Sequence, residues 1–210
     1  MDQSKYTQLL NADGVKIAGF GNAGFDTAAL AAVLRTLAIE TPPQGATLVI
    51  SHNAEHKWGQ DVFTVGGLFL KGYWTYRHAD RNLPYIGCDR LIANWELCTA
   101  AGVPVPEYKG VYAVKEGDDW MWSGIIAENL AGWRNMDKHS AADQALMEQA
   151  IDAFANKGVL NRDMHSDNVM TDGNGNFRVV DLDNLAFGQV PAEAKAAMLA
   201  FYRESLNWPD

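Results

Sequence analysis

The segment NRDMHSDNVM, residues 161–170, places polar and ionisable side chains densely between two apolar stretches. It holds Asp163 and Asn168, and Asp181 follows in FRVVDLDN. The turn sequence TDGNGN between them predicts a hairpin that returns Asp181 to the neighbourhood of Asn168. An amide oxygen and a carboxylate suit Mg²⁺, which takes few protein ligands and keeps water or phosphate in its other positions. Asp163 would then accept a proton from an attacking hydroxyl, as metal-assisted phosphoryl transfer requires.

This segment resembles the catalytic loop of the protein kinase-like superfamily. The family's H-R-D-L-K-P-E-N is similar to N-R-D-M-H-S-D-N, and its D-F-G is similar to the D-L-D that begins at Asp181. The resemblance implies that Asp163 is the catalytic base and that Asn168 and Asp181 hold the Mg²⁺ of Mg-ATP. Two departures stand out: Asn161 replaces the family's His, a mainly structural position, and Asp183 replaces its Gly, which could stiffen or charge the site.

His165 stands where protein kinases prefer Lys. In this respect the loop looks more like the aminoglycoside-phosphotransferase branch, whose pattern is H-G-D-x-H-x-x-N. We expect His165 to have a structural role, with its ring bonded to backbone near the loop. A direct catalytic role is the alternative.

Other residues follow in the order of the family, and the resemblance covers roughly residues 48–184. Lys71, late on a strand that follows a hairpin, resembles the lysine that contacts the α- and β-phosphates of ATP. Glu96, on the next helix, resembles its ion-pair partner. IIAENLAG resembles the hinge, where the backbone from Glu128 to Leu130 would hydrogen-bond adenine. The alternatives are a solvated strand lysine, with Lys57 as a nearby rival, and an ordinary exposed glutamate.

Two segments compete as the loop that covers the ATP phosphates. Residues 19–24 form a literal G-x-G-x-x-G, but they precede a predicted helix and lie far ahead of Lys71. Residues 51–60 join two predicted strands just before the lysine strand, although they contain a single glycine. We favour residues 51–60. A dinucleotide-binding interpretation of residues 19–24 fails because no alternation typical of a parallel sheet follows.

The elements that must position these residues follow from periodicity and turn signals. Strand-like runs are ATLVIS, DVFTV and LFLKGYW, and hairpin turns are predicted at residues 65–67, at EGDD and at DGNGN. Apolar spacing and caps predict helices at residues 26–40, 87–101, about 140–157 and near 191–205. Strands in front and helices behind indicate an α+β fold, and the resemblance implies a minimal two-lobed protein kinase-like one.

We expect one kinase-like domain over residues 1–210. An N-lobe of about 1–130 would include an extra N-terminal helix, and a reduced C-lobe would span 131–210. Only 26 residues follow Asn184, which leaves no room for the activation segment and full helical lobe of an ordinary protein kinase.

Composition limits the partners. The formal charge is −9, with no run of Lys or Arg, so nucleic acid and anionic membranes are not expected as main partners. No apolar stretch approaches the roughly 18 residues of a membrane span, and the start lacks a secretory signal. The two cysteines favour free thiols in a reducing compartment.

At whole-chain scale the sequence resembles the HopBF family of bacterial type III secretion effectors, minimal kinases delivered into host cells. That resemblance implies a protein-serine kinase, secreted into the host cytoplasm, that phosphorylates and inactivates the host's ninety-kilodalton heat-shock chaperone. Without it, a cytoplasmic protein is expected. Two alternatives remain: a small-molecule kinase of the aminoglycoside or sugar class, favoured by His165 but disfavoured by the short C-terminal part, and a non-catalytic pseudokinase.

Overall fold

The computed structural model describes residues 3–36, 45–51, 60–74, 88–116 and 118–205. The chain divides into two compact units. The first unit consists of Met1–Ala93 and Glu107–Leu130, and the second consists of Asn94–Pro106 and Ala131–Asp210. The chain therefore enters the second unit twice.

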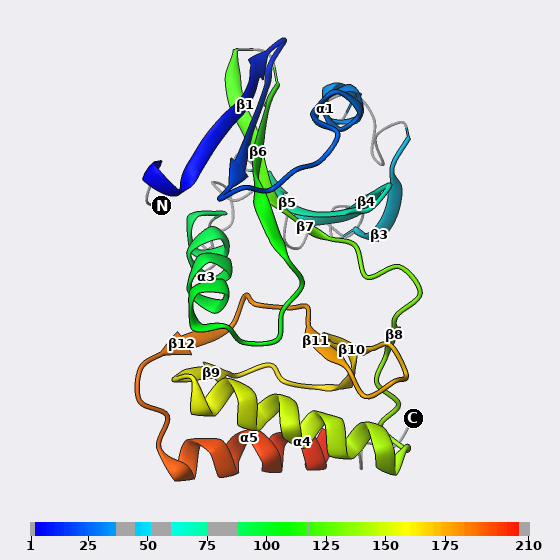
Figure 1. The fold of residues 1–210 in the computed structure, drawn as a ribbon, viewed down its shortest axis with the longest axis vertical. Helices are drawn as coiled ribbons and strands as arrows, with labels where there is room; N and C mark the ends of the chain where they lie inside the picture. The colour runs from blue at the N-terminus through cyan, green and yellow to red at the C-terminus, as the bar shows by residue number, and fades with distance from the viewer. Residues whose placement is uncertain (1–2, 37–44, 52–59, 75–87, 117, 206–210) are drawn as a thin grey trace. The chain divides into compact units, whose positions relative to one another are not determined.

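The first unit is built on a seven-stranded sheet in the order β1-β2-β6-β7-β5-β4-β3 (Figure 1). Every neighbouring pair of strands is antiparallel. A short 3-10 helix, Gln3–Lys5, precedes the sheet. The strands are β1 (Tyr6–Ala12), β2 (Val15–Phe20), β3 (Thr47–Ser51), β4 (Gln60–Val65), β5 (Leu68–Trp74), β6 (Tyr108–Glu116) and β7 (Asp119–Glu128).

Two hairpins predicted in this sheet are confirmed. Val65 pairs with Leu68 across the Gly66-Gly67 turn, and Gly66 has a φ of 55° that suits glycine. Strands β6 and β7 pair from Glu116↔Asp119 onward. Strands β3 and β4 are also antiparallel neighbours, and residues 52–59, which join them, lie outside the described residues.

The β1–β2 hairpin was not predicted from the sequence. Its turn is Asp13-Gly14, with φ values of 51° and 73°. Two successive positive φ angles define the type I′ turn, for which Asp-Gly is a preferred pair. That dipeptide, between YTQLLNA and VKIAGF, was the available signal.

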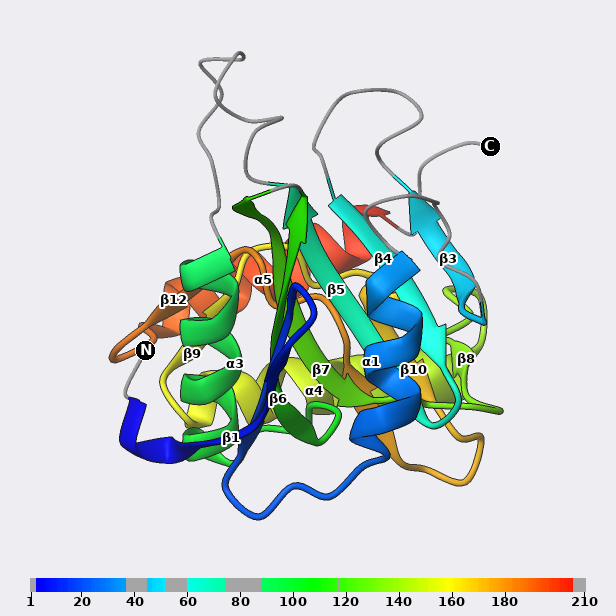
Figure 2. The same cartoon turned by 90° about the horizontal axis from the view of Figure 1, so that it is seen from above.

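Helix α1 (Thr27–Thr36) covers one face of the sheet and closes the core of the first unit (Figure 2). Asp26 begins the helix, because its Oδ1 accepts a hydrogen bond from the Ala29 N–H at 2.9 Å. The described part agrees with the predicted helix at 26–40, whose last residues lie outside the described ranges. The core consists of Leu30, Ala31 and Leu34 of α1 with Val15, Ile17, Phe63, Leu68, Leu70, Tyr112, Val114 and Ile126 of the sheet.

Three further helices were predicted and are confirmed: α3 (Cys88–Ala101), α4 (Ala141–Asn156) and α5 (Ala192–Ser205). The division between the units falls within α3. That helix ends at Gly102, whose φ is 66°, and the Val103 N–H donates back to the Cys98 carbonyl at 3.3 Å. Helices α4 and α5 pack against each other in the second unit (Figure 1).

Two small antiparallel sheets complete the second unit. The hairpin predicted at DGNGN is confirmed as β10–β11, and β8, which was not predicted, adds to its other side. Strand β9 pairs with β12. The bounds are β8 (Arg134–Asn135), β9 (Val159–Asn161), β10 (Val169–Thr171), β11 (Phe177–Val179) and β12 (Leu185–Phe187), with a 3-10 helix, η2, at Ser166–Asn168.

The predicted fold class, α+β with a sheet-rich front and a helical back, is confirmed. Within the described ranges, no helix has both the length and the apolar character that crossing a bilayer would take.

Candidate functional site

The NRDMHSDN segment connects β9 to β10 in the second unit, with η2 at its end. Local sequence explains the course of the chain. Val159 and Val169 are fully buried and fix the two strands, while the polar residues between them bend the chain through side chain–backbone bonds.

Asn161 ties together the two parts of the site. Its side chain is completely buried, although it is polar. Its Oδ1 accepts a hydrogen bond from the Asp163 N–H at 2.8 Å, and its Nδ2 donates to the Asp181 carbonyl at 3.3 Å. One amide therefore joins the segment of Asp163 to the segment of Asp181, which fits the structural role that the resemblance implies for this position.

The side-chain amide of Asn168 has a fixed orientation. Its Nδ2 donates to the Asp163 carbonyl at 2.9 Å and lies 3.3 Å from Asp163 Oδ2. A backbone carbonyl can only accept, so the nitrogen must face it and the amide oxygen must face away. That oxygen forms no hydrogen bond with another described residue. It is a hard neutral ligand of the kind Mg²⁺ binds.

His165 braces the loop, as predicted, through the backbone. Its Nδ1 accepts from the Asp167 N–H at 3.3 Å and so caps η2. Its Nε2 lies 3.0 Å from Asn168 Nδ2 and 3.6 Å from Asp163 Oδ1. Because Nδ1 accepts, Nε2 is the ring nitrogen that can donate, and the Asp163 carboxylate is an acceptor on that side.

The hairpin returns Asp181 to the neighbourhood of Asn168, as predicted. Val169 pairs with Val179, and the Val180 N–H donates to the Asn168 carbonyl at 3.0 Å. The Asp183 N–H donates to Asp181 Oδ1 at 3.2 Å, which holds one carboxylate oxygen toward the backbone. In the described part of the chain, no three His, Cys, Asp or Glu side chains gather as a metal cluster. The amide of Asn168 and the carboxylate of Asp181 stay the predicted donor set for Mg²⁺.

Residues 94–106 hold the segment around Asp181 from the other side. Asn94 Nδ2 donates to the Leu182 carbonyl at 2.6 Å, and the Val179 N–H donates to the Pro104 carbonyl at 2.9 Å. The chain is thus held on either side of Asp181, at Val179 before it and at Leu182 after it.

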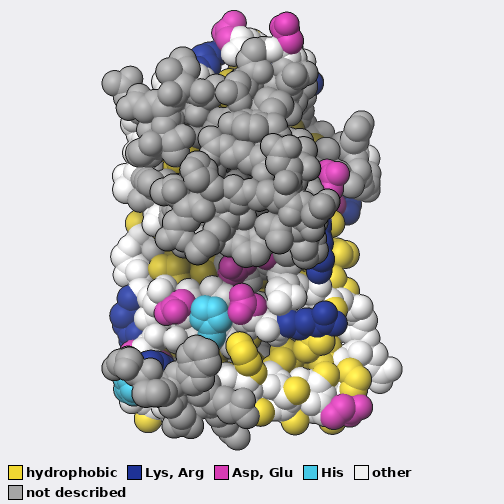
Figure 3. Space-filling view, turned by 180° about the vertical axis from the view of Figure 1, so that it is seen from behind, with side chains coloured by type: hydrophobic (Ala, Val, Ile, Leu, Met, Phe, Trp, Pro, Cys, Tyr) yellow, Lys and Arg dark blue, Asp and Glu magenta, His cyan; other side chains and the backbone are white. Residues whose placement is uncertain are grey.

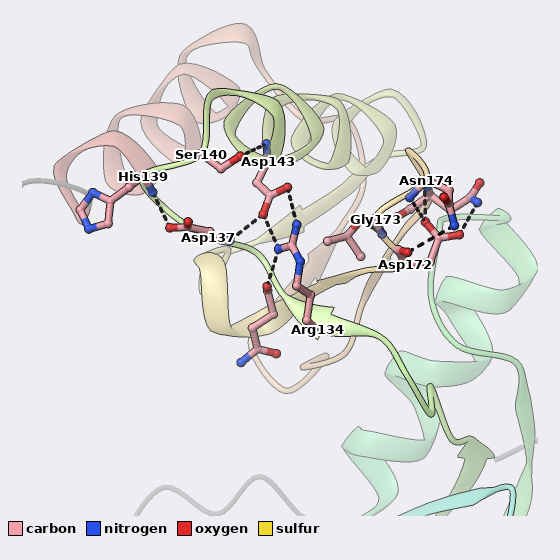
Figure 4. A network of polar contacts seen from close by, with 11 residues as sticks. Arg134, Asp137, His139, Ser140, Asp143, Asp172, Gly173 and Asn174 are labelled. Atoms are coloured by element: carbon pink, nitrogen blue, oxygen red, sulfur yellow. Dashed lines mark hydrogen bonds and ion pairs between the residues drawn. The ribbon is translucent and has the colours of Figure 1, made fainter.

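A second polar network anchors β8, the neighbour of β10 (Figure 4). Asp143, buried at the start of α4, accepts from Arg134 NH1 at 2.5 Å and from the Asp137 N–H at 2.7 Å. Its own N–H donates to the Ser140 cap at 3.3 Å. The hydrogen bond from Arg134 lowers the pKa of the Asp143 carboxyl below its usual value. This pair fixes α4 to the sheet that carries the candidate loop.

The DGNGN turn is closed by its own side chains (Figure 4). Asp172 Oδ1 accepts from the Asn174 N–H at 2.8 Å, and its Oδ2 accepts from Asn176 Nδ2 at 2.7 Å. The hydrogen bond from the Asn176 side chain has the largest effect, and together these bonds lower the pKa of the Asp172 carboxyl. The carboxylate serves the turn.

Lys71 and Glu96 are buried, with 5% and 8% of their surface exposed. The alternative predictions, that Lys71 is solvated and that Glu96 is exposed, are therefore wrong. Buried charges require partners or a bound ion, which marks both as structural or functional positions. Lys71 lies on β5 in the first unit, and Glu96 lies on the part of α3 that belongs to the second. Their predicted roles toward ATP stay predictions.

The predicted hinge begins at Glu128, the last residue of β7, in the first unit. The Glu128 N–H donates to the Glu107 carbonyl at 2.9 Å, and the Asn129 N–H donates to the Gly67 carbonyl at 3.0 Å. The N–H of Leu130 has no hydrogen bond to another described residue. Among the predicted hinge residues, Leu130 thus keeps an N–H that is not used within the described part of the chain.

The G-x-G-x-x-G segment at residues 19–24 does not have the geometry of a phosphate loop. Its Gly21 and Ala23 N–H groups already donate to the Lys5 and Phe20 carbonyls, at 3.0 and 3.1 Å. The helix that follows is capped by Asp26, whose negative charge would repel a phosphate. The favoured alternative, residues 51–60, falls largely outside the described residues.

No protein-family model matches the chain, and no curated protein matches it in sequence.

Solved structures of similar shape include a complex of WaaP with acyl carrier protein, at 15% identity and a TM-score of 0.48, over 74% of this chain and 68% of that one. WbdD, described as a bifunctional kinase-methyltransferase, is similar at 15% identity and 0.48, over 72% of this chain and 36% of that one. A glucosamine kinase is similar at 13% identity and 0.40, over 95% and 79%. The chain thus spans about a third of WbdD. Likenesses of this strength do not assign a family or an activity.

Proposed function

We propose that the protein is an ATP- and Mg²⁺-dependent phosphotransferase. One observation carries the proposal: the buried Asn161 amide joins the segment of Asp163 to that of Asp181, while the Asp163 carbonyl turns the oxygen of Asn168 outward. These contacts hold one carboxylate near a donor set that fits Mg²⁺, as in metal-assisted phosphoryl transfer.

In this proposal Asp163 acts on the acceptor. Its side chain is 45% exposed, so a hydroxyl can reach it, while its backbone is held by Asn161. The acceptor oxygen forms a bond to the γ-phosphorus as the bond from that phosphorus to the oxygen of ADP breaks. The hydroxyl proton passes to the Asp163 carboxylate. Bound Mg²⁺ would neutralise the phosphate charge, with Asn168 and Asp181 as its protein ligands.

The first unit would supply Lys71 and the hinge for nucleotide binding, and the second unit would supply Glu96. Lys71, buried on β5, is proposed to contact the phosphates, with Glu96 as its partner. The free N–H of Leu130 and the backbone of Glu128 are proposed to bind adenine. The support is that Lys71 is buried and that the Leu130 N–H forms no hydrogen bond to another described residue, together with the sequence resemblance.

For the acceptor, we propose a serine of a protein. The support is the resemblance to the HopBF effectors, which also suggests delivery into a host cell and the ninety-kilodalton heat-shock chaperone as substrate. A small-molecule acceptor is the second candidate, and His165 at its aminoglycoside-phosphotransferase position favours it. A pseudokinase that binds a partner is the third.

The catalytic assignment is tested with purified protein, Mg-ATP and an acceptor. We expect Asp163→Ala to lower transfer by about 10²- to 10⁴-fold, the usual contribution of a general base, with nucleotide binding retained. Asp181→Ala should weaken binding of Mg-ATP as well. Asp167→Ala is the matched control, because that carboxylate is in the same loop but 76% exposed. Wild-type turnover in both Asp163→Ala and Asp181→Ala would overturn the proposal.

The acceptor class is tested with radiolabelled ATP in a host-cell lysate. A labelled band that matches the heat-shock chaperone, reproduced with purified chaperone, supports the protein-serine kinase. Label in aminoglycosides or sugars supports the second candidate. Nucleotide binding with no transfer to either supports the pseudokinase.

A further inference from the structure

A hollow of about 250 Å³ lies in the second unit beside the proposed catalytic loop. One wall comes from β9 and the loop, and the other comes from α5. The lining residues that matter are Leu160, Arg162 and Met164 from the first wall and Ala197, Met198 and Phe201 from the second.

The interior of this hollow is apolar. Met164 and Met198 are 1% and 5% exposed and lie deep, whereas Phe201 at the rim is 46% exposed. Methionine adapts its shape to different apolar guests. The volume is below the roughly 300–1,000 Å³ of pockets that enclose a drug-sized ligand. It suits one large side chain of a polypeptide better than a whole small molecule.

The rim carries a cation. Arg162 is exposed, and its backbone N–H donates to the Asn184 carbonyl at 3.0 Å, which fixes the base of the side chain. Among the described residues, its guanidinium has no carboxylate partner. Lys195 of α5, by contrast, is paired with Asp152. In a chain of charge −9, an unpaired arginine beside an apolar hollow favours a guest with its own carboxylate.

The hollow adjoins the proposed base in the chain. Arg162 and Met164 are the immediate neighbours of Asp163, and consecutive Cα atoms are about 3.8 Å apart. An extended peptide advances about 3.3 Å per residue, so a side chain that entered the hollow would belong to a residue one to three positions from the acceptor hydroxyl. Figure 3 shows acidic side chains on both sides of a histidine, with a basic side chain and an apolar area beside them on one face.

We infer that this hollow is a docking subsite for the acceptor polypeptide, which rests on the phosphotransferase function proposed above. A large apolar side chain, one to three residues from the acceptor serine, enters between Met164 and Met198. An adjacent Asp or Glu bonds to Arg162. The subsite would select acceptors by the sequence around the acceptor serine.

The test is phosphorylation of a serine peptide library in which each flanking position is varied in turn. Wild type should prefer Leu, Met or Phe at one position and Asp or Glu beside it. Arg162→Glu should reverse the charge preference toward Lys or Arg. Ala197→Trp, which fills the hollow, should abolish the apolar preference and raise KM for the best peptide about tenfold. The matched control is Ala196→Trp, the adjacent exposed position of α5 that does not line the hollow, and it should keep both preferences.

Each outcome decides the question. Preferences that shift as stated support the subsite. Peptide phosphorylation with unchanged preferences in both variants overturns it, as does transfer to sugars or aminoglycosides alone. A wild-type dimer in solution that Ala197→Trp dissociates would assign the hollow to a second copy instead. Mg-ATP binding and ATP hydrolysis, followed in parallel, separate these results from failure of the phosphotransferase function, in which hydrolysis and transfer would both be absent whether or not Mg-ATP binds.

Discussion

Replacement of Asn161 by alanine tests how the two halves of the candidate site are held together. The substitution removes the acceptor of the Asp163 N–H and the donor to the Asp181 carbonyl. Each buried polar group left without a partner costs about 1–3 kcal/mol. Two such groups would lose their partners, and because Asp163 is partly exposed, water compensates in part; we therefore expect a total loss near the lower end of the sum, about 2–3 kcal/mol, in the stability of the loop.

The direct measurement is amide hydrogen exchange at Asp163. A loss of about 2–3 kcal/mol should raise its exchange rate about 30- to 150-fold, since 1.4 kcal/mol is a factor of ten. The loop should also hold the base less accurately, and kcat/KM should fall about 100-fold. Asn156→Ala is the control, because that asparagine is exposed at the end of α4.

If the Asp163 amide in Asn161→Ala exchanged at the wild-type rate, the bond at 2.8 Å would not be what orders the loop. If exchange rose but Mg-ATP binding and transfer were unchanged, the loop would not be the catalytic one. Either result would refute the reasoning from geometry to function.

Three further results are expected. The arginine partner lowers the pKa of Asp143 in the folded protein, so the carboxylate stabilises the fold above the usual aspartate pKa, and this stabilisation is lost as the pH falls through the lowered pKa. Below about pH 4, the denaturation midpoint should therefore fall less steeply with pH in Asp143→Asn than in wild type. Equal slopes would contradict this. A Cβ at Gly124 would overlap the Lys71 carbonyl, so Gly124→Ala should destabilise the first unit by about 1–3 kcal/mol in urea titrations, and a neutral effect would show that the strands can separate freely. Burial raises the pKa of Cys88 to about 11 and that of Cys98 to about 12, so iodoacetamide at pH 7.5 should label neither until denaturant is added, and rapid native labelling would disprove their burial.

Elements with a strong repeating signal could be predicted from the sequence. Helix α4 has apolar residues on one face and a serine that caps it, and the Gly66-Gly67 turn fixes the β4–β5 hairpin. The two-residue strand β8 has no comparable signal, because it is defined by pairing with β10 rather than by its own residues. Strand order in the large sheet likewise depends on contacts between distant segments.

The candidate site divides in the same way. The positions of Asp163, Asn168 and Asp181 along the chain, with a turn sequence between them, were enough to predict that the loop and the hairpin meet. From the sequence, Asn161 could be assigned only a structural role, because its two partners lie 2 and 20 residues away in different connecting segments. Nothing in the sequence indicated that Asn94 would bond to the Leu182 carbonyl.

The second unit is made of two stretches, with β6 and β7 synthesised between them. The partner of Asn94, the Leu182 carbonyl, lies 88 residues later in the chain, so all strands of the large sheet are synthesised before that bond can form. This large separation in sequence should slow the folding of the second unit, since contacts between distant residues form late. A fragment that starts at residue 131 would lack Asn94 and Pro104, and we expect it to emerge without an ordered Asp181 segment. Expression or domain-exchange experiments on this half should therefore carry residues 94–106 with it.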